Sequence, residues 1–339
     1  LWGGTDVCPD DLVGVFSSTK GVSAIAIALL VQRGQIDLDA PVSRYWPQFA
    51  AGGKGAVTVR LALSHQAGVA GVEPQLSSLT EFLDHATVAA RVAAQVPQWR
   101  PGAACGYHGN TIGTIMDELC RRITGISIAQ FFREEIADPR AIDFFISTPE
   151  EAEARVKPLL PAPAPSPRPE ADSLSGLSQN LAGFHKDASF DIDVPLPNVR
   201  QVRAAGQAAL SGVSSARGMA RVYATCFGEV DGFPPLLSPE TVALVSQIQT
   251  VGDDLILGYP ARYAIVFQKP HDGYQIGSWQ AFGHGGAGGS IGVADPLHNL
   301  AYAWIPRRMT VPGGADPRGL LLAKLIRACA ARAAAQVGQ

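Results

Sequence analysis

The sequence predicts an α+β protein in which an antiparallel sheet is flanked by helices and a mainly helical domain is inserted into the chain. Strand-like segments occur near the N-terminus and again in the last third, whereas the middle is mainly helical with long loops. We therefore expect an α/β domain formed by residues 1–58 and 205–339, and a helical domain formed by residues 59–204. The 339 residues, 47% of them hydrophobic, are enough for a core of this size.

The elements follow in order along the chain. Residues 1–4 resemble the end of a strand, residues 11–16 are apolar and strand-like, and residues 22–31 form an apolar run typical of a buried helix. Further helices are expected at 59–63, 79–94, 110–122, 128–136 and 149–157.

The last part of the chain returns to strands. Residues 158–169 are rich in proline and should be extended and exposed. Strands are then expected at 263–267, 289–293 and 301–305, and a final helix at 317–335.

Ser17 and Lys20 are the first candidate catalytic pair. They form a Ser-x-x-Lys pattern at the start of the first predicted helix, where side chains three residues apart share a face. A serine hydroxyl needs a neighbouring base to act as a nucleophile, and a lysine buried at this place can be that base. In the alternative interpretation, Ser17 is a helix cap and Lys20 is a solvated residue.

Two later segments contribute further candidates. A Pro-Gly turn places Tyr107 at the start of the helix predicted at 110–122. Residues 282–292 are so rich in glycine that their backbone can approach a ligand closely. His65 lies at a predicted helix end and is expected to be structural.

Together these segments resemble the three motifs of the penicillin-recognising serine enzymes. That superfamily includes class A and class C β-lactamases, D-Ala-D-Ala carboxypeptidases and the family VIII carboxylesterases. Ser17 and Lys20 match its Ser-x-x-Lys motif. Tyr107 matches the tyrosine of Tyr-x-Asn, and residues 284–286, His-Gly-Gly, stand in place of Lys-Thr-Gly. The resemblance covers nearly the whole chain, is greatest to the family VIII esterases, and implies a β-lactamase/transpeptidase-like fold.

Two positions depart from the motifs of lactam-directed members. His284 replaces a lysine that helps to bind a substrate carboxylate, and Gly109 replaces an asparagine that contacts a substrate amide. Histidine is neutral over much of the range around its usual pKa, so it is a weaker anchor for a carboxylate. Both departures favour an ordinary ester as the substrate, although His284 packing inside the strand is an alternative.

The resemblance also implies a role for each candidate. Ser17 would attack the ester carbonyl, Lys20 with Tyr107 would accept its proton, and Tyr107 would pass a proton to the leaving alcohol. The backbone N–H groups of Ser17 and Ala287 would form the oxyanion hole. The residues expected to bind substrate are His284, Gly285 and Gly286, together with His108, which is expected to line the pocket because it follows Tyr107.

The sequence thus predicts a serine carboxylesterase that acts on short acyl esters, with weak β-lactamase activity also compatible. One alternative is a β-lactamase or a D-amino-acid peptidase, and another is a relative that has lost catalysis and serves as a binding or scaffold protein. A Ser-His-Asp triad is the rival catalytic interpretation.

Composition and charge bear on partners and location. The net charge of −3 gives no reason to expect nucleic acid as a partner, so a small-molecule ester is the expected one. The histidines are scattered without a metal motif, so no metal or cofactor is expected, and no apolar run approaches the ~20 residues of a membrane span. Five widely spaced cysteines indicate a reducing, cytoplasmic location. The chain begins at Leu1, close before Ser17, so we expect an N-terminal part to be missing and export stays an alternative.

Overall fold

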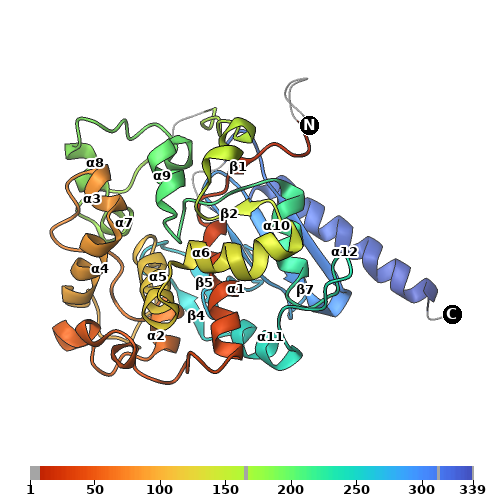
Figure 1. Cartoon of the computed structure of the whole chain (residues 1–339), viewed down its shortest axis with the longest axis horizontal. Helices are drawn as coiled ribbons and strands as arrows, with labels where there is room; N and C mark the ends of the chain where they lie inside the picture. The colour runs from red at the N-terminus through yellow and green to blue at the C-terminus, as the bar shows by residue number, and fades with distance from the viewer. Residues whose placement is uncertain (1–7, 164–166, 311–313, 338–339) are drawn as a thin grey trace.

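An antiparallel sheet lies beside the buried helix Ser18–Gln32 in the computed structural model, which describes residues 8–163, 167–310 and 314–337 (Figure 1). The strands β6 (Phe282–Gly285), β7 (Ile291–Asp295) and β8 (Leu300–Trp304) pair in the order β6-β7-β8. The hairpin of β4 (Thr250–Asp253) and β5 (Pro260–Tyr263) joins the same sheet through bridges at Gln268. The strand expected at residues 1–4 lies outside the described residues.

The two faces of this sheet carry different helices, as the two-residue period of β7 requires. Gly292 faces α10 (Ala216–Ala224), because a Cβ built on it would lie 2.3 Å from the Tyr223 ring. Its neighbours Ile291 and Val293 point to the other face, where they pack with Ala323 of α12 (Pro317–Val337). The helix α1 (Ser18–Gln32) contacts β6 and β7.

Helix α1 is buried on all sides, as its sequence predicts. Every residue from Ser18 to Leu30 is buried, and a helix that is apolar all round belongs in a core. It is surrounded by α5 (Thr111–Thr124), α6 (Ile128–Phe132) and α11 (Pro239–Ser246) as well as by the sheet. This central position fixes the residues at its N-terminus firmly.

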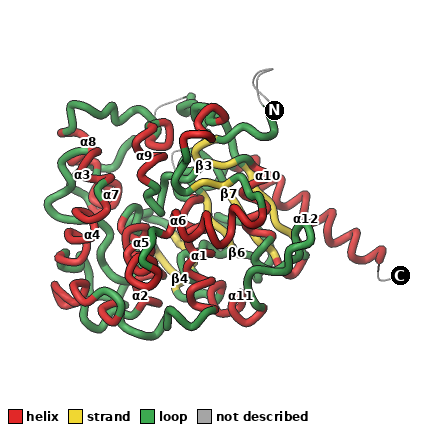
Figure 2. The backbone as a smooth tube through the Cα atoms, viewed as in Figure 1, coloured by secondary structure: helices red, strands yellow, loops and turns green. Residues whose placement is uncertain are grey.

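The middle of the chain forms a mainly helical region. Figure 2 shows it almost entirely as helix and loop, on the side of the molecule away from α12. Besides α5 and α6, its helices are α2 (Val59–Leu63), α3 (Leu79–Leu83), α4 (His85–Ala94), α7 (Leu174–Gln179), α8 (Leu181–Lys186) and α9 (Arg200–Ala205). The α+β prediction is therefore confirmed, while the domain boundaries at 58/59 and 204/205 stay a prediction.

Several predicted helices are shorter or differently wound than expected. The helix expected at 79–94 is broken at Asp84, whose carboxylate accepts a hydrogen bond from the Thr87 N–H and caps α4. The segment 128–136 continues past α6 only as a π-turn at Arg133–Ala137. The segment 149–157 is a 3₁₀-helix at Glu150–Arg155. The final helix and α2 are confirmed.

The strand predicted at 263–267 is wrong. Only Tyr263 belongs to β5, and the next residues turn back, with the Ala264 N–H donating to the Phe267 carbonyl at 2.8 Å. Val266 has a φ of +66°, which no strand allows. The turn is buried and its residues are apolar, so the sequence here has the apolar run that is typical of a buried strand. The strands predicted at 289–293 and 301–305 are confirmed as β7 and β8, displaced by one or two residues.

The strand predicted at 11–16 is mostly loop. Only Val13–Gly14 forms β1, which pairs with β3 (Val213–Ser214), and β3 in turn pairs with β2 (Phe144–Phe145).

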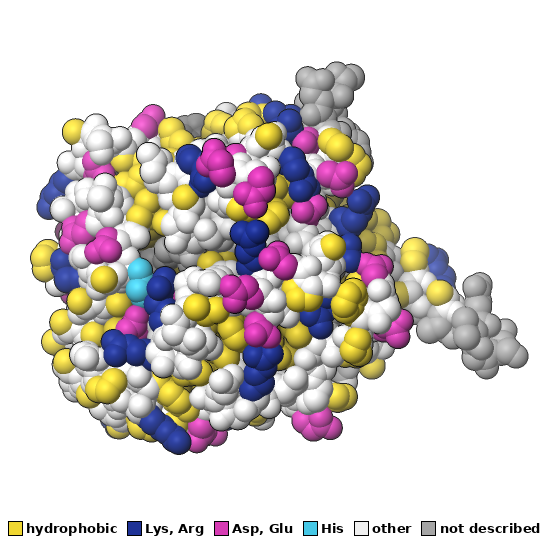
Figure 3. Space-filling model, in the orientation of Figure 1, with side chains coloured by type: hydrophobic (Ala, Val, Ile, Leu, Met, Phe, Trp, Pro, Cys, Tyr) yellow, Lys and Arg dark blue, Asp and Glu magenta, His cyan; other side chains and the backbone are white. Residues whose placement is uncertain are grey.

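Basic and acidic side chains are interspersed on the face drawn in Figure 3, without a large area of one sign. Within the described ranges, no helix has both the length and the apolar character needed to cross a membrane.

Candidate active site

Ser17 lies in the tight turn between β1 and α1. The preceding residue, Phe16, has a φ of +45°, a left-handed conformation that a bulky residue rarely adopts and that recurs at functional sites. Ser17 is the N-cap residue of α1, yet its hydroxyl makes no capping hydrogen bond. The interpretation of Ser17 as a simple helix cap is therefore wrong, and its hydroxyl is available at the positive end of the helix.

Lys20 is the partner of that hydroxyl. Its Nζ donates to Ser17 Oγ at 3.0 Å and to the Ala209 carbonyl at 3.0 Å. Lys20 is completely buried rather than solvated, and burial lowers its pKa well below the ordinary value of 10.5. Among the described residues no carboxylate pairs with it. Burial thus favours the neutral amine, which can accept a proton.

Tyr107 completes the group. It lies in the loop before α5, three residues ahead of the N-cap Asn110, and its ring centroid is 4.9 Å from Lys20 Nζ. Burial raises the pKa of Tyr107, and a hydrogen bond with Ser17 partly opposes that rise. Tyr107 is therefore a neutral phenol that can relay a proton. The fold brings together Ser17, Lys20 and Tyr107 as the sequence predicted.

The end of β6 approaches the serine turn closely. A Cβ built on Gly286 would lie only 2.1 Å from the Val15 carbonyl oxygen and 3.1 Å from the Ser18 nitrogen, so no larger residue fits there. The N–H groups of Ser17 and Ala287 donate to no acceptor in the part of the chain that the structure describes. Unpaired N–H groups at such a turn can stabilise an oxyanion.

Two serines that the sequence did not single out join these segments. Ser18 Oγ donates to the His284 carbonyl at 3.1 Å and lies 2.9 Å from Ser290 Oγ. Ser290 Oγ donates to the Val15 carbonyl at 2.7 Å. Both hydroxyls are buried and fix the serine turn against β6 and β7. Their places within the Ser-x-x-Lys motif and the glycine-rich segment 282–292 were the sequence signal that could have found them.

His284 lies beside the group formed by Ser17, Lys20 and Tyr107. Its ring centroid is 6.1 Å from that of Tyr107, and its Nδ1 is 2.7 Å from the Gly285 carbonyl oxygen. Burial, with a further contribution from Lys20, lowers the pKa of His284 to about 3. The ring is therefore neutral, so it lacks the positive charge of the lysine that it replaces.

His108 is buried behind the loop. Its Nε2 accepts from the Val69 N–H at 3.0 Å, and its Nδ1 is 2.6 Å from the Gly106 carbonyl oxygen. Both ring nitrogens are thus used by the backbone, so the ring holds the Tyr107 loop in place and has no nitrogen left for a substrate. His65 supports the same loop, accepting from the His108 N–H at 3.0 Å and packing 5.0 Å from the Tyr107 ring.

The arrangement can be compared with known proteins. The family model described as beta-lactamase matches residues 1–325. The chain belongs to the β-lactamase family.

Relatives of this β-lactamase-family protein include named esterases. EstA from Arthrobacter nitroguajacolicus Rue61a is 42% identical, has a TM-score of 0.90, and matches over 98% of this chain and 88% of its own. A family VIII carboxylesterase of known structure is 32% identical, with a TM-score of 0.82 over 94% and 84% of the two chains. The esterase/β-lactamase LipL of Mycobacterium tuberculosis is 33% identical over 88% of this chain and 70% of its own sequence. The predicted resemblance is confirmed, and the protein is a serine hydrolase of this family.

Gly109, the departure in the second motif, has a steric reason. A Cβ on Gly109 would lie 2.7 Å from Ser178 Oγ and 2.9 Å from the Ser178 carbonyl oxygen. The Gly109 N–H donates to Ser178 Oγ at 2.9 Å, and Asn110 Nδ2 donates to the Ser178 carbonyl at 2.9 Å. Helix α7 therefore occupies the space of the usual asparagine, and Asn110 is bonded to α7.

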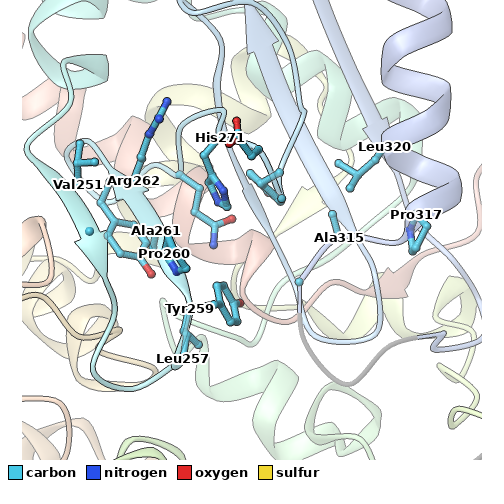
Figure 4. A pocket seen from close by; sticks show the side chains of 17 residues that line it. Val251, Leu257, Tyr259, Pro260, Ala261, Arg262, His271, Ala315, Pro317 and Leu320 are labelled. Atoms are coloured by element: carbon cyan, nitrogen blue, oxygen red, sulfur yellow. The ribbon is translucent and has the colours of Figure 1, made fainter.

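A cavity of about 580 Å³ lies next to Gly285 in the His-Gly-Gly segment. Figure 4 shows Leu257 and Tyr259 of the β4–β5 hairpin on one side and Ala315, Pro317 and Leu320 on the other. Gly285 adjoins it, because a Cβ there would lie 3.0 Å from Tyr274 Oη and 3.4 Å from the Ala315 nitrogen, both of lining residues. Within the described ranges no cluster of three or more His, Cys, Asp or Glu side chains is arranged to hold a metal ion.

Proposed function

We propose that this protein hydrolyses short-chain carboxylic esters through an acyl-enzyme on Ser17. The observation that carries the proposal is the 3.0 Å hydrogen bond between Ser17 Oγ and the buried Nζ of Lys20. A serine hydroxyl becomes a nucleophile when a neighbouring base takes its proton, and burial prepares Lys20 for that role.

In the first half of the reaction, Ser17 Oγ forms a bond to the ester carbonyl carbon while its proton passes to Lys20. The negative charge on the carbonyl oxygen is held by the N–H groups of Ser17 and Ala287. The carbon–oxygen bond to the alcohol then breaks, and Tyr107 delivers a proton to the departing oxygen while regaining one from Lys20.

In the second half, water replaces the alcohol. Tyr107 and Lys20 remove a proton from the water, whose oxygen bonds to the acyl carbon. The bond to Ser17 Oγ breaks, the proton returns to that oxygen, and the free acid leaves. The site returns to its starting protonation, so no cofactor is needed for this sequence.

The two departures from the lactam-directed motifs support an ester as the substrate. The neutral His284 offers no charge to a substrate carboxylate, and Gly109 offers no side-chain amide. Relatives that carry esterase in their names, LipL and a family VIII carboxylesterase, agree with this proposal. The cavity beside Gly285 has room for the acyl or the alcohol part, since ligand sites typically measure ~300–1,000 Å³.

A second candidate function is weak hydrolysis of β-lactams. It is favoured by one observation, that LipL carries both esterase and β-lactamase in its name. A lactam would use the same Ser17 acylation, so the two functions differ only in how the site holds the rest of the substrate.

The test is a steady-state assay of p-nitrophenyl acetate and butyrate beside a chromogenic cephalosporin, with wild type and Ser17→Ala. Ser43→Ala is the matched control, because Ser43 is only partly buried and its hydroxyl bonds to the Gly55 carbonyl, away from the site. We expect ester turnover that Ser17→Ala abolishes and Ser43→Ala retains, with little cephalosporin turnover. Dominant cephalosporin turnover would establish the lactamase alternative. No turnover of either would favour the binding or scaffold alternative.

A further inference from the structure

Asp254 is a buried carboxylate behind the catalytic tyrosine. It follows β4 at the tip of the β4–β5 hairpin and is only 1% exposed. No basic side chain forms an ion pair with it in the described part of the chain. Burying a carboxylate costs free energy unless hydrogen bonds compensate for the lost water. The groups that bond to Asp254 therefore indicate its role.

Its partners fall into two groups. Asp254 Oδ1 accepts from the Ile256 and Leu257 N–H groups, both at 2.9 Å, which closes the hairpin tip. The same oxygen accepts from the Tyr107 N–H at 3.0 Å, across 147 residues of sequence. The first group is local, whereas the second ties the hairpin directly to the residue proposed to relay protons.

The other carboxylate oxygen reaches the Tyr107 ring indirectly. Tyr263 Oη donates to Asp254 Oδ2 at 2.9 Å, and the Tyr263 ring stacks on that of Tyr107 with centroids 6.4 Å apart and planes 23° from parallel. The Leu255 N–H also donates to the Cys105 carbonyl at 2.9 Å, beside the same loop. Asp254 thus holds both the backbone and, through Tyr263, the ring of Tyr107.

We infer that Asp254 is a positioning residue that fixes Tyr107 for proton transfer to the leaving alcohol. This inference rests on the proposed function. Asp254 does not touch the reacting atoms, and it acts by setting where the Tyr107 hydroxyl lies relative to Ser17 and Lys20. A proton relay is sensitive to such placement, because small displacements of a catalytic group reduce rates strongly.

If Asp254 positions Tyr107, its loss slows acylation to an extent that depends on the leaving group, which a merely structural role would not produce. p-Nitrophenolate departs without being protonated, whereas ethanol must receive a proton as its bond breaks. A misplaced Tyr107 therefore slows acylation by ethyl butyrate more than acylation by p-nitrophenyl butyrate. The quantity to compare is kcat/KM, which reports acylation for both esters.

The experiment measures kcat/KM on both esters for wild type, Asp254→Ala and Asp254→Asn. The control is Asp253→Ala, an exposed neighbour on the same hairpin. We expect Asp254→Ala to lose about ten-fold more on ethyl butyrate than on p-nitrophenyl butyrate. Asp254→Asn should recover most of the loss, because its side-chain oxygen can still accept from the Tyr107 N–H. Asp253→Ala should match wild type on both esters.

Equal losses on the two esters, or no loss, would overturn the inference. If Asp254→Ala does not fold, Tyr263→Phe decides, since it removes only the Tyr263 hydroxyl donor. A selective loss on ethyl butyrate in that variant supports the inference, and unchanged or equally changed values contradict it. Failure of the proposed function is distinguishable, because the wild type itself would then turn over neither ester.

Discussion

Burial alone lowers the pKa of Lys20 and so favours the neutral amine that can accept a proton. Among the described residues, its amine hydrogen-bonds to Ser17 Oγ and to the Ala209 carbonyl, and neither group is charged. Burial disfavours the ammonium, so the pKa falls and the neutral form becomes available at lower pH. A lysine with its ordinary pKa of 10.5 would be almost fully protonated at neutral pH and could not act as a base.

This gives a prediction for the pH profile. An unperturbed Lys20 would make kcat/KM rise about ten-fold per pH unit up to 10.5. Because the pKa is lowered, we expect kcat/KM on p-nitrophenyl butyrate to reach its plateau well below that pH and to fall only on further acidification. Lys20→Met, which keeps the length without the amine, should lose ~10²–10⁴-fold. A profile that keeps rising toward pH 10.5, or a Lys20→Met variant near wild type, would refute this role.

The close packing of Gly109 against Ser178 gives a prediction about thermal stability. Restoring the family's asparagine by Gly109→Asn would bring a Cβ within 2.9 Å of the Ser178 carbonyl oxygen, which is backbone and cannot turn aside. Forced packing of this kind costs about 1–3 kcal/mol, so thermal unfolding should show a lower Tm. Gly55→Ala is the control, because the nearest atom to its Cβ is 3.9 Å away. A Gly109→Asn variant as stable as Gly55→Ala would contradict the steric explanation.

Some helices and strands could be predicted from the apolar pattern of the sequence, and others could not. Helix α1 and strands β7 and β8 were predictable because their apolar patterns match their burial. The turn after Tyr263 was not, because its apolar residues are buried without forming a strand, and only the backbone reveals the positive φ of Val266. The break at Asp84 could have been found, since aspartate is a strong N-cap residue.

Helix α5 provides a prediction about stability. His85 of α4 lies between two of its carboxylates, with Nδ1 3.0 Å from Asp117 and Nε2 2.8 Å from Glu118. Glu118 also accepts from Arg122 at 2.8 Å, and its side chain is only 9% exposed. The hydrogen bonds with His85, and then with Arg122, lower the pKa of Glu118 below 4.5.

A lowered carboxyl pKa adds stability above the unfolded-state pKa, and that stability is lost as the pH falls through the folded-state value. We therefore expect Glu118→Gln to lower the free energy of unfolding by about 1–3 kcal/mol at pH 7. The difference should shrink steadily as denaturant titrations are repeated below pH 4.5. Glu134→Gln, on an exposed surface, should show little change at either pH. A Glu118→Gln effect that is independent of pH would exclude the ionic explanation.

At the scale of the whole molecule, the candidate site draws on segments far apart in the chain. Ser17, Tyr107 and His284 could be predicted to meet only because each lies in a recognisable motif. Asp254 lies in no recognisable motif, and Ser18 and Ser290 lie within motifs that assign them no role, so their contacts appear only when the chain is folded. His108 was predicted as a substrate-binding residue from its position beside Tyr107. The sequence could not show that both of its ring nitrogens hydrogen-bond to backbone groups instead.

The arrangement of sheet and helices explains why the site forms where it does. The turn that carries Ser17 is held by β1, α1 and the β6–β7 turn, whereas Tyr107 comes from the helical region and is held by the β4–β5 hairpin. The site therefore depends on how these two regions pack together. A change in that packing alters the relation of Tyr107 to Ser17 without touching either residue.

Ser17 is the proposed nucleophile, and covalent labelling of the folded protein identifies the nucleophile without reference to any substrate. The folded protein is treated with a fluorophosphonate, and the modified peptide is identified by mass spectrometry, with Ser17→Ala and Ser43→Ala in parallel. We predict a single adduct on Ser17 in wild type and Ser43→Ala, and no adduct in Ser17→Ala. An adduct on another serine, or equal labelling of the Ser17→Ala variant, would contradict the account.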